Sequence, residues 1–302
     1  MTVLEAIKKS ADFLSKKGVE SARLQSELLL AHQLKLPRMK LYLNFDRELT
    51  PDETDSLRDL VKRRSAREPL QHIVGSTSFC GHEILVSRHA LIPRPETELL
   101  AELGWKYLST VNSEHLTALD FGTGTGCIAI ALAAKCPNTK ITALDISPEA
   151  LELARQNAGQ NQVAERIDFL QGDGFAVLPG RAEYDLIVSN PPYIASPEIE
   201  TLEPEVKDFD PRTALDGGTD GLDFYHRLAK EAGPFLKPGG KIMVEFGDGQ
   251  ADAIKNIFEA EKWIVEAVQE DYSQRARILI AKSSSFSSSS SKTQSEDKGR
   301  ER

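Results

Sequence analysis

A regular alternation of short apolar runs with longer amphipathic stretches begins near residue 116 and constrains the fold more than any other feature. Strands are expected at 117–121, 140–144, 167–171, 184–189, 241–245, 263–268 and 276–281. Helices are expected among them at 127–135, 148–158, 222–236 and 251–260. This alternation is typical of a doubly wound α/β domain. Ligands of such domains bind at the carboxyl ends of the strands, so the functional residues are expected there.

The first seventy residues instead predict a small helical bundle. Residues 2–5 (Thr-Val-Leu-Glu) and 50–53 (Thr-Pro-Asp-Glu) have the pattern of a capping box, and apolar residues follow at helical spacing. Further helices are expected at 21–34 and, as a short helix or turn, at 37–43. Short alternating runs after residue 71, broken by Gly75 and Gly81, predict a β-hairpin. We therefore expect a helical domain at 1–70, a hairpin linker at 71–92 and the α/β domain at 93–282.

Composition sets the broad class. Of the 302 residues, 40% are apolar and 27% are charged, which is ordinary for a soluble protein. No apolar run approaches the roughly 18 residues of a membrane span. The three cysteines form no Cys-x-x-Cys pair, so neither a metal site nor a disulfide framework is expected, and a cytoplasmic setting fits best. The serine-rich stretch that opens residues 283–302 predicts a disordered tail.

Charge bears on the partners. The net charge of −9 argues against a protein that grips long nucleic acid, because such binding depends on neutralising phosphates. We expect a monomer that has no stable nucleic-acid partner. The helix that begins near residue 50 does carry a local basic cluster, which is interpreted as a solvated face with a few ion pairs. The alternative is a contact with an acidic partner or RNA; the cluster comprises Arg58, Lys62, Arg63, Arg64 and Arg67.

A glycine-rich loop joins the first expected strand of the α/β domain to the helix at 127–135. It reads Asp-Phe-Gly-Thr-Gly-Thr-Gly, and its last five residues are Gly122, Thr123, Gly124, Thr125 and Gly126. Glycines let the backbone turn sharply and approach a ligand closely. Asp145 closes the second strand, where a carboxylate can accept hydrogen bonds from ribose hydroxyls, and Asp173 and Gly174 follow the third. Three successive polar strand ends indicate a nucleoside.

Two nucleoside ligands fit such a loop, a dinucleotide or S-adenosylmethionine. In the dinucleotide fingerprint Gly-x-Gly-x-x-Gly, a pyrophosphate sits at the helix N-terminus. Here the third glycine comes one residue early, and Asp120 precedes the loop. A carboxylate at that position would repel a pyrophosphate, but it suits the cationic sulfonium and ammonium groups of S-adenosylmethionine. We therefore expect S-adenosylmethionine as the cofactor.

The loop Asn190-Pro191-Pro192-Tyr193 follows a buried strand and indicates chemistry on a planar nitrogen. Asn190 offers a side-chain carbonyl, and the rigid backbone of Pro191 offers a second acceptor. Together they can hold both hydrogens of an NH₂ group and point its nitrogen at a methyl donor. Tyr193 can pack flat on the planar group. Positioning would supply most of the catalysis. Asp185 is a candidate general base by proximity only, and it is interpreted as a structural residue.

These motifs resemble the Rossmann-like amino-methyltransferases, and within them the PrmC (HemK) family of release factor glutamine methyltransferases. The resemblance covers about residues 1–282. It rests on the loop at 120–128, on 188–194 and on three further segments: 91–98 (Leu-Ile-Pro-Arg-Pro-Glu-Thr-Glu), 203–206 (Glu-Pro-Glu-Val) and 214–221 (Ala-Leu-Asp-Gly-Gly-Thr-Asp-Gly). Within 91–98, Thr97 is expected to cap a helix from Glu98 to about 108.

The resemblance implies a seven-stranded, mostly parallel sheet and a helical N-terminal substrate-recognition domain. It implies methyl transfer from S-adenosylmethionine to the glutamine amide of the Gly-Gly-Gln motif in a class I peptide chain release factor. Asn190 to Tyr193 would bind the glutamine, with Asn190, Pro191 and Tyr193 catalytic. The cofactor would contact Asn190 as well, together with Gly122 to Gly126, Asp145, Asp173 and Gly174. Gly174 departs from relatives with a bulkier side chain there.

Three other interpretations of these motifs are less consistent with the sequence. A nucleic-acid amine methyltransferase shares the 190–193 loop but usually needs a surface rich in Lys and Arg, which the acidic balance disfavours. A non-catalytic binding module would have lost Asn190 or the glycines, and neither is lost. Cys127, at a helix N-terminus, could have a lowered pKa, although a buried packing thiol is the better interpretation.

Overall fold

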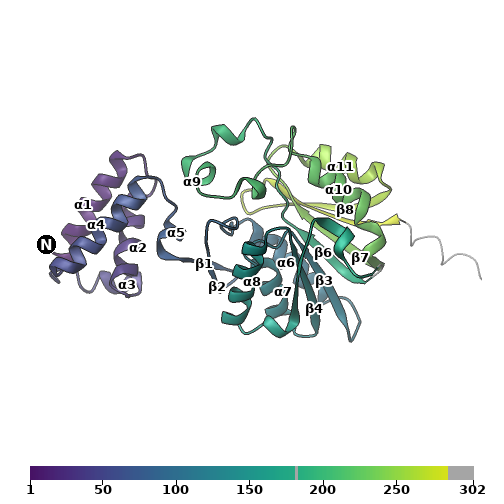
Figure 1. Cartoon of the computed structure of the whole chain (residues 1–302), viewed down its shortest axis with the longest axis horizontal. Helices are drawn as coiled ribbons and strands as arrows, with labels where there is room; N and C mark the ends of the chain where they lie inside the picture. Colours follow the sequence, from purple (N-terminus) through teal and green to yellow (C-terminus); the bar gives the residue numbers. More distant parts are fainter. Residues whose placement is uncertain (181–182, 285–302) are drawn as a thin grey trace, which may run out of the picture.

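The computed structural model describes residues 1–180 and 183–284. Its N-terminal part is a bundle of helices around a core of its own, at one end of the elongated molecule (Figure 1). Both expected capping boxes are present, at Thr2–Glu5 and Thr50–Glu53, and they open the first and the fourth helix. The helices are α1 (Val3–Lys16), α2 (Ala22–Gln33), α3 (Arg38–Leu41), α4 (Pro51–Ser65) and α5 (Leu70–Val74).

The expected β-hairpin is present, but it begins later than predicted. Strands β1 (Ser76–Phe79) and β2 (His82–Leu85) pair antiparallel. The preceding residues, expected as part of the linker, form helix α5 instead, and Ile73 is buried in the core of the bundle. Pro69 at the helix start and Gly75, whose φ of 86° ends the helix in the left-handed region, explain why this short segment turns.

The C-terminal part is a Rossmann-like α/β sheet of seven strands, in the order β5-β4-β3-β6-β7-β9-β8. β3, β4, β5, β6 and β7 run parallel, and β9 is antiparallel to both its neighbours. The strands are β3 (Leu116–Phe121), β4 (Thr139–Asp145), β5 (Ile167–Gln171), β6 (Tyr184–Ser189), β7 (Leu236–Glu245), β8 (Trp263–Glu270) and β9 (Ala276–Ser283). The predicted seven-stranded, mostly parallel sheet is confirmed.

Helices cover both faces of this sheet. The α-helices are α6 (Thr97–Leu108), α7 (Cys127–Lys135), α8 (Pro148–Gln160), α9 (Pro204–Lys207), α10 (Asp223–Glu231) and α11 (Ala251–Ala260). Alternate residues of β6 point to opposite faces, so Leu186 and Val188 join one core cluster with α6 and α7, while Ile187 joins a second with α10 and α11. Both faces are therefore apolar, which explains why the strands appear in the sequence as continuous apolar runs.

Several boundaries differ from the sequence predictions, and three of the differences have a local physical reason. Thr97 is the first residue of α6 rather than its cap, and its side chain is used elsewhere. The helix expected at 222–236 ends at Glu231, because Gly233 and Pro234 interrupt it, and β7 already begins at Leu236. β9 extends to Ser283, since backbone pairing with Trp263 does not depend on an apolar side chain. Otherwise the tail expected at 283–302 lies outside the described residues, apart from Ser284.

The basic cluster on α4 joins the two parts of the chain, so its interpretation as a solvated face is wrong for two of its members. Arg64 is only 4% exposed, and its guanidinium donates to Glu205 of α9 at 2.7 Å. Arg67 donates to both Glu205 and Glu203. These acidic residues belong to the long connection that follows Tyr193, so α4 is tied to the segment beside the expected substrate loop.

No helix in the described parts of the chain is long and apolar enough to cross a membrane.

Replacing Arg64 by Ala should loosen this connection. The change leaves the Glu205 carboxylate with Arg67 alone and removes a buried partner of Gln25, at a cost of about 1–3 kcal/mol. We expect faster amide hydrogen exchange across α9 and a lower melting temperature. Arg58→Ala is the matched control, because Arg58 pairs with Asp55 on the surface of the same helix and exposed pairs contribute little. Equal exchange rates in the two variants would contradict this role.

Candidate active site

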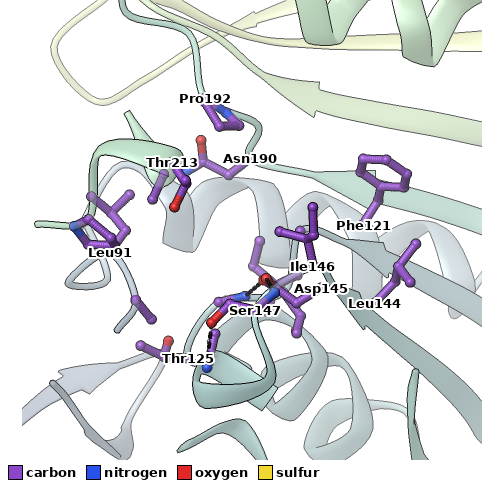
Figure 2. Close-up of a pocket in the computed structure, with 18 of the residues that line it drawn as sticks. Leu91, Phe121, Thr125, Leu144, Asp145, Ile146, Ser147, Asn190, Pro192 and Thr213 are labelled. Carbon is purple, nitrogen blue, oxygen red and sulfur yellow. Dashed lines mark hydrogen bonds between the residues drawn. The ribbon is translucent and has the colours of Figure 1, made fainter. Parts of the chain in front are cut away.

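A cavity opens at the carboxyl ends of β3, β4 and β6, where the fold predicts it (Figure 2). Its walls come from the glycine-rich loop and the start of α7, from residues around the end of β4, from Asn190 and Pro192, and from the 89–97, 172–174, 211–214 and 224–227 segments. All the cofactor residues predicted from sequence line it except one. Gly126 alone does not: Gly122, Thr123, Gly124, Thr125, Asp145, Asp173, Gly174 and Asn190 do.

The glycine-rich loop takes a conformation that only glycine adopts easily. Gly122, Gly124 and Gly126 have φ values of 76°, 55° and 81°, all in the left-handed region. Gly126 also has no room for a side chain, because a Cβ there would lie 3.0 Å from Ala154 of α8. This explains its place outside the cavity wall: it lets α7 start close to α8. The other two glycines present bare backbone to the cavity.

Asp145 fixes the loop from the neighbouring strand. One carboxylate oxygen accepts from the backbone N–H of Gly124 at 2.8 Å, and the other accepts from that of Ser147 at 2.9 Å. Each oxygen has a further lone pair to offer to the cavity. Asp145 is thus both a support of the loop and an acceptor available to a ligand. The next residue, Ile146, is 59% exposed and presents an apolar surface beside it.

Asp120 lies beneath the loop and not in the cavity wall. Its carboxyl group is fully buried, accepting from the Thr123 hydroxyl at 2.6 Å and from the backbone N–H of Ala129 at 3.1 Å. Burial raises its pKa to about 7, against the lowering effect of these two hydrogen bonds. The expectation that this carboxylate faces a cationic cofactor is therefore not met by direct contact. Its role in this structure is to hold the loop to the start of α7.

Asp173 and Gly174 form the far end of the cavity, where Arg227 of α10 joins them. The Arg227 guanidinium donates to the carboxylate and to the backbone carbonyl of Asp173. A Cβ on Gly174 would lie 2.0 Å from this guanidinium, so the arginine occupies the space that a bulkier residue would need. Arg227 could not be found from the sequence, because nothing in a helix 54 positions further on indicates a contact with Asp173.

Asn190 lies where two cavities meet. It lines the first cavity with Pro192, and it lines a second one with Pro191 and Tyr193. The second cavity is otherwise mostly apolar, with Ile194, Leu202, Val206 and Leu215 in its wall, and it shares Leu91, Arg94 and Ala214 with the first. The side-chain NH₂ of Asn190 donates to the Thr97 hydroxyl at 3.0 Å. The four residues of the loop thus divide between two adjoining spaces, with Asn190 common to both.

The Asn190 loop is held from below. The backbone carbonyl of Tyr193 accepts from the Gln250 side chain at 3.0 Å, and burial raises the pKa of the Tyr193 phenol. On the other side, Arg94 donates to the buried Asp210 at 2.6 Å, which orders the 92–98 segment across the cavity. From the sequence, Arg94 is only part of a motif, and Thr97 is expected only as a helix cap. Their side-chain roles depend on contacts across 93 and 116 positions.

Two sequence alternatives are decided by position. Asp185 lies at the start of β6, the opposite end from Asn190, and binds the backbone of Thr117 and the Lys237 ammonium. It is structural, as the sequence interpretation favoured. Cys127 lines the cavity but is buried, and burial raises its pKa well above the usual thiol range. The packing interpretation of this thiol is therefore the right one.

Models of known protein families match both parts of the chain. The model of the PrmC N-terminal domain matches residues 5–75, and that of the methyltransferase small domain matches 104–202. A release factor glutamine methyltransferase of Geobacter sulfurreducens is 44% identical over 258 residues, covering 85% of this chain and 88% of the relative. The chain belongs to the release factor glutamine methyltransferase family. A second member, from Chlorobaculum tepidum, is 38% identical and covers 92% of this chain and 96% of its own.

Among solved structures, the hMettl16 catalytic domain is similar with a TM-score of 0.54 at 16% identity, over 76% of this chain and 82% of that one, which shows the fold alone. Membership in the family makes the chain a methyltransferase whose methyl donor is S-adenosylmethionine. The residues of the first cavity fit that group. Asp145 has lone pairs for hydroxyls, Ile146 offers an apolar face for a base, and the cavity extends from there to Asn190.

Proposed function

We propose that this enzyme methylates the side-chain amide nitrogen of the glutamine in the Gly-Gly-Gln motif of a class I peptide chain release factor. The observation that carries the proposal is the position of Asn190 between the two cavities. Four residues, Leu91, Arg94, Asn190 and Ala214, line both cavities, and of these only Asn190 carries a side-chain amide. The names of the relatives, release factor glutamine methyltransferase, support the choice of substrate.

The loop residues are suited to hold an amide. With its NH₂ engaged by Thr97, Asn190 has its side-chain oxygen left to accept from the substrate NH₂. The Pro191 carbonyl is the proposed second acceptor, and Tyr193 and Pro192 form the walls against the planar group. Two acceptors on its hydrogens would fix the nitrogen and stabilise the positive charge that develops on it. When bound, S-adenosylmethionine supplies the methyl group as a sulfonium.

The first cavity would bind the cofactor through residues already described. We propose that Asp145 accepts from the ribose hydroxyls, that Asp173 and Gly174 bound the adenine end, and that Gly122, Thr123, Gly124 and Thr125 present backbone to the amino-acid portion. Asn190 would contact the reacting end of the cofactor. Gly126 has a supporting role only, since its backbone conformation and close packing shape the loop from outside the cavity.

The helical part of the chain is the proposed docking site for the release factor. We propose that the chain is divided into a recognition domain at 1–70, a linker at 71–92 and a methyltransferase domain at 93–282. Exposed apolar side chains on and beside α3 support it, because Met39 and Leu43 are 68% and 76% exposed. The link from α4 to Glu205 connects this part to the wall of the second cavity. We further propose a cytoplasmic monomer without a stable nucleic-acid partner.

The decisive experiment is a labelling assay. The purified enzyme is incubated with methyl-labelled S-adenosylmethionine and a class I release factor, and the label should appear on the Gly-Gly-Gln glutamine by peptide mass spectrometry. A release factor with Gly-Gly-Ala in its place is the control and should remain unlabelled. RNA and DNA are offered in parallel reactions. Label on nucleic acid, with none on the release factor, would reject the proposal in favour of a nucleic-acid amine methyltransferase.

A further inference from the structure

A buried carboxyl group lies beside the Asn190 loop and has no part in the chemistry described so far. Glu245 is the last residue of β7, which pairs in parallel with β6, and the pair Ser189–Val244 places Asn190 and Glu245 one step further along adjoining strands. Glu245 is 2% exposed, and its Oε2 has no hydrogen-bond partner among the described residues. It lines neither cavity, so any influence on the substrate must pass through a neighbour.

Thr97 is that neighbour. Its side chain is 3% exposed, and its hydroxyl oxygen accepts from the Asn190 NH₂ at 3.0 Å. The Thr97 hydroxyl and the Asn190 amide both lie close enough to Glu245 to favour the charged form of its carboxyl group. A hydroxyl has one hydrogen to donate. Since Thr97 accepts from Asn190, this hydrogen is available to the Glu245 carboxylate.

A hydrogen bond from the Thr97 hydroxyl to the Glu245 carboxylate would determine which way the Asn190 amide faces. An ionised carboxylate can only accept, so it requires the Thr97 hydroxyl to donate to it. The hydroxyl oxygen then accepts a hydrogen bond from the Asn190 NH₂. The side-chain oxygen of Asn190 therefore points away from Thr97. We propose that Glu245, acting through Thr97, is a positioning residue that holds the Asn190 side-chain oxygen toward the substrate amide. This inference rests on the proposed function of Asn190.

Protonation of Glu245 should release that constraint. A neutral carboxyl group can donate to Thr97, whose hydrogen then becomes free to donate to the Asn190 oxygen, and the amide can rotate into the inactive orientation. Burial raises the pKa of Glu245 to about 7; Thr97, Arg277 of β9 and Asn190 lower it, and Glu96 before α6 raises it. The phenols of Tyr193 and of Tyr225 in α10 are the other titratable groups nearby, and burial raises the pKa of both, so they stay neutral here.

The first test is kinetic. For the wild type, the kcat for methylation of the release factor should rise with pH through an apparent pKa of about 7. Glu245→Gln should lower kcat at pH 8 by about 10- to 100-fold and abolish this rise, while the Kd for S-adenosylmethionine stays within about threefold. Thr97→Val should cause a similar loss of kcat. Thr97→Ser, which keeps the hydroxyl, should recover most of the loss seen with Val.

The second test does not depend on activity. The side-chain ¹⁵N resonance of Asn190, assigned by its loss in Asn190→Ala, should titrate near pH 7 in the wild type and Thr97→Ser. It should not titrate in Glu245→Gln or Thr97→Val. If it titrates as expected but no release factor is labelled, the proposed function fails while the coupling stands. If Glu245→Gln does not fold, the two Thr97 variants decide the matter.

The inference is overturned if the Asn190 resonance is insensitive to pH between 5.5 and 8.5 in the wild type. It is overturned equally if Thr97→Val retains the kcat and the pH profile of the wild type. A purely structural role for Glu245 predicts a lower melting temperature with an unchanged apparent pKa, which is distinguishable from both results.

Discussion

Asn190→Ala should lower the kcat for release factor methylation by about 10²–10³-fold, the usual loss when one preorganised hydrogen-bonding group is removed from a reacting centre. Asn190 lines both cavities, and its oxygen is the side-chain acceptor proposed for the substrate amide. Without it the amide keeps one acceptor and can rotate away from the donor. The measurement is single-turnover methyl transfer at saturating cofactor, with the Kd for S-adenosylmethionine measured separately by calorimetry.

The Kd should change by less than about threefold, because the cavity walls at Asp145 and the glycine-rich loop remain in place. Asn256→Ala is the matched control. Asn256 is exposed on α11, away from both cavities, and its removal should leave kcat unchanged. A fully active Asn190→Ala enzyme would refute the role given to this residue, and so would a loss confined to cofactor binding.

Asp145→Ala should weaken the binding of S-adenosylmethionine by about 100-fold, or about 2.7 kcal/mol. Two effects combine in this estimate. The proposed hydrogen bonds to the ribose are lost, and the N–H groups of Gly124 and Ser147 lose the acceptor that holds them. Binding of the demethylated product, S-adenosylhomocysteine, should weaken to the same extent, because it has the same ribose hydroxyls and the methyl group on sulfur makes no hydrogen bond. Calorimetry with both compounds measures the change.

Asp168→Ala provides the comparison for this variant. Asp168 lies on the neighbouring strand β5, and its carboxylate forms an exposed pair with Lys140, so its loss should leave cofactor affinity unchanged. If Asp145→Ala bound both compounds with the affinity of the wild type, the cofactor could not be using the end of β4. The assignment of the first cavity to S-adenosylmethionine would then need revision.

The strands of the sheet could be predicted well because each one follows from its local sequence. β5 and β6 have the predicted bounds, 167–171 and 184–189, since apolar residues on both faces make each strand a continuous run with a polar residue at its end. The same logic located the polar strand ends Asp145 and Asn190 at one edge. Errors occurred where a single turn decides the boundary, as at Gly233 and Pro234, or where backbone pairing alone extends a strand, as at Ser283.

The parts of the site that could not be predicted are contacts between distant side chains. Arg227 reaches Asp173 from α10, Thr97 reaches Asn190 from α6, and neither residue carries a local pattern that announces its partner. Thr97 resembled a helix cap because caps and first-turn residues differ by one position. The sequence correctly predicts that Asp120 ends the strand before the glycine-rich loop. It does not predict that the side chain lies beneath the loop, away from the cavity, where it accepts from the Thr123 hydroxyl.

The ion pairs between α4 and Glu205 also limit how this chain can be recombined with its relatives. A helical part taken from a relative without arginines at positions 64 and 67 would leave Glu205, which is 20% exposed, without these cationic partners. The reverse exchange would leave Arg64, which is only 4% exposed, without a carboxylate partner. A functional chimera therefore has to transfer α4 together with residues 203–205, although about 140 positions separate them in the sequence.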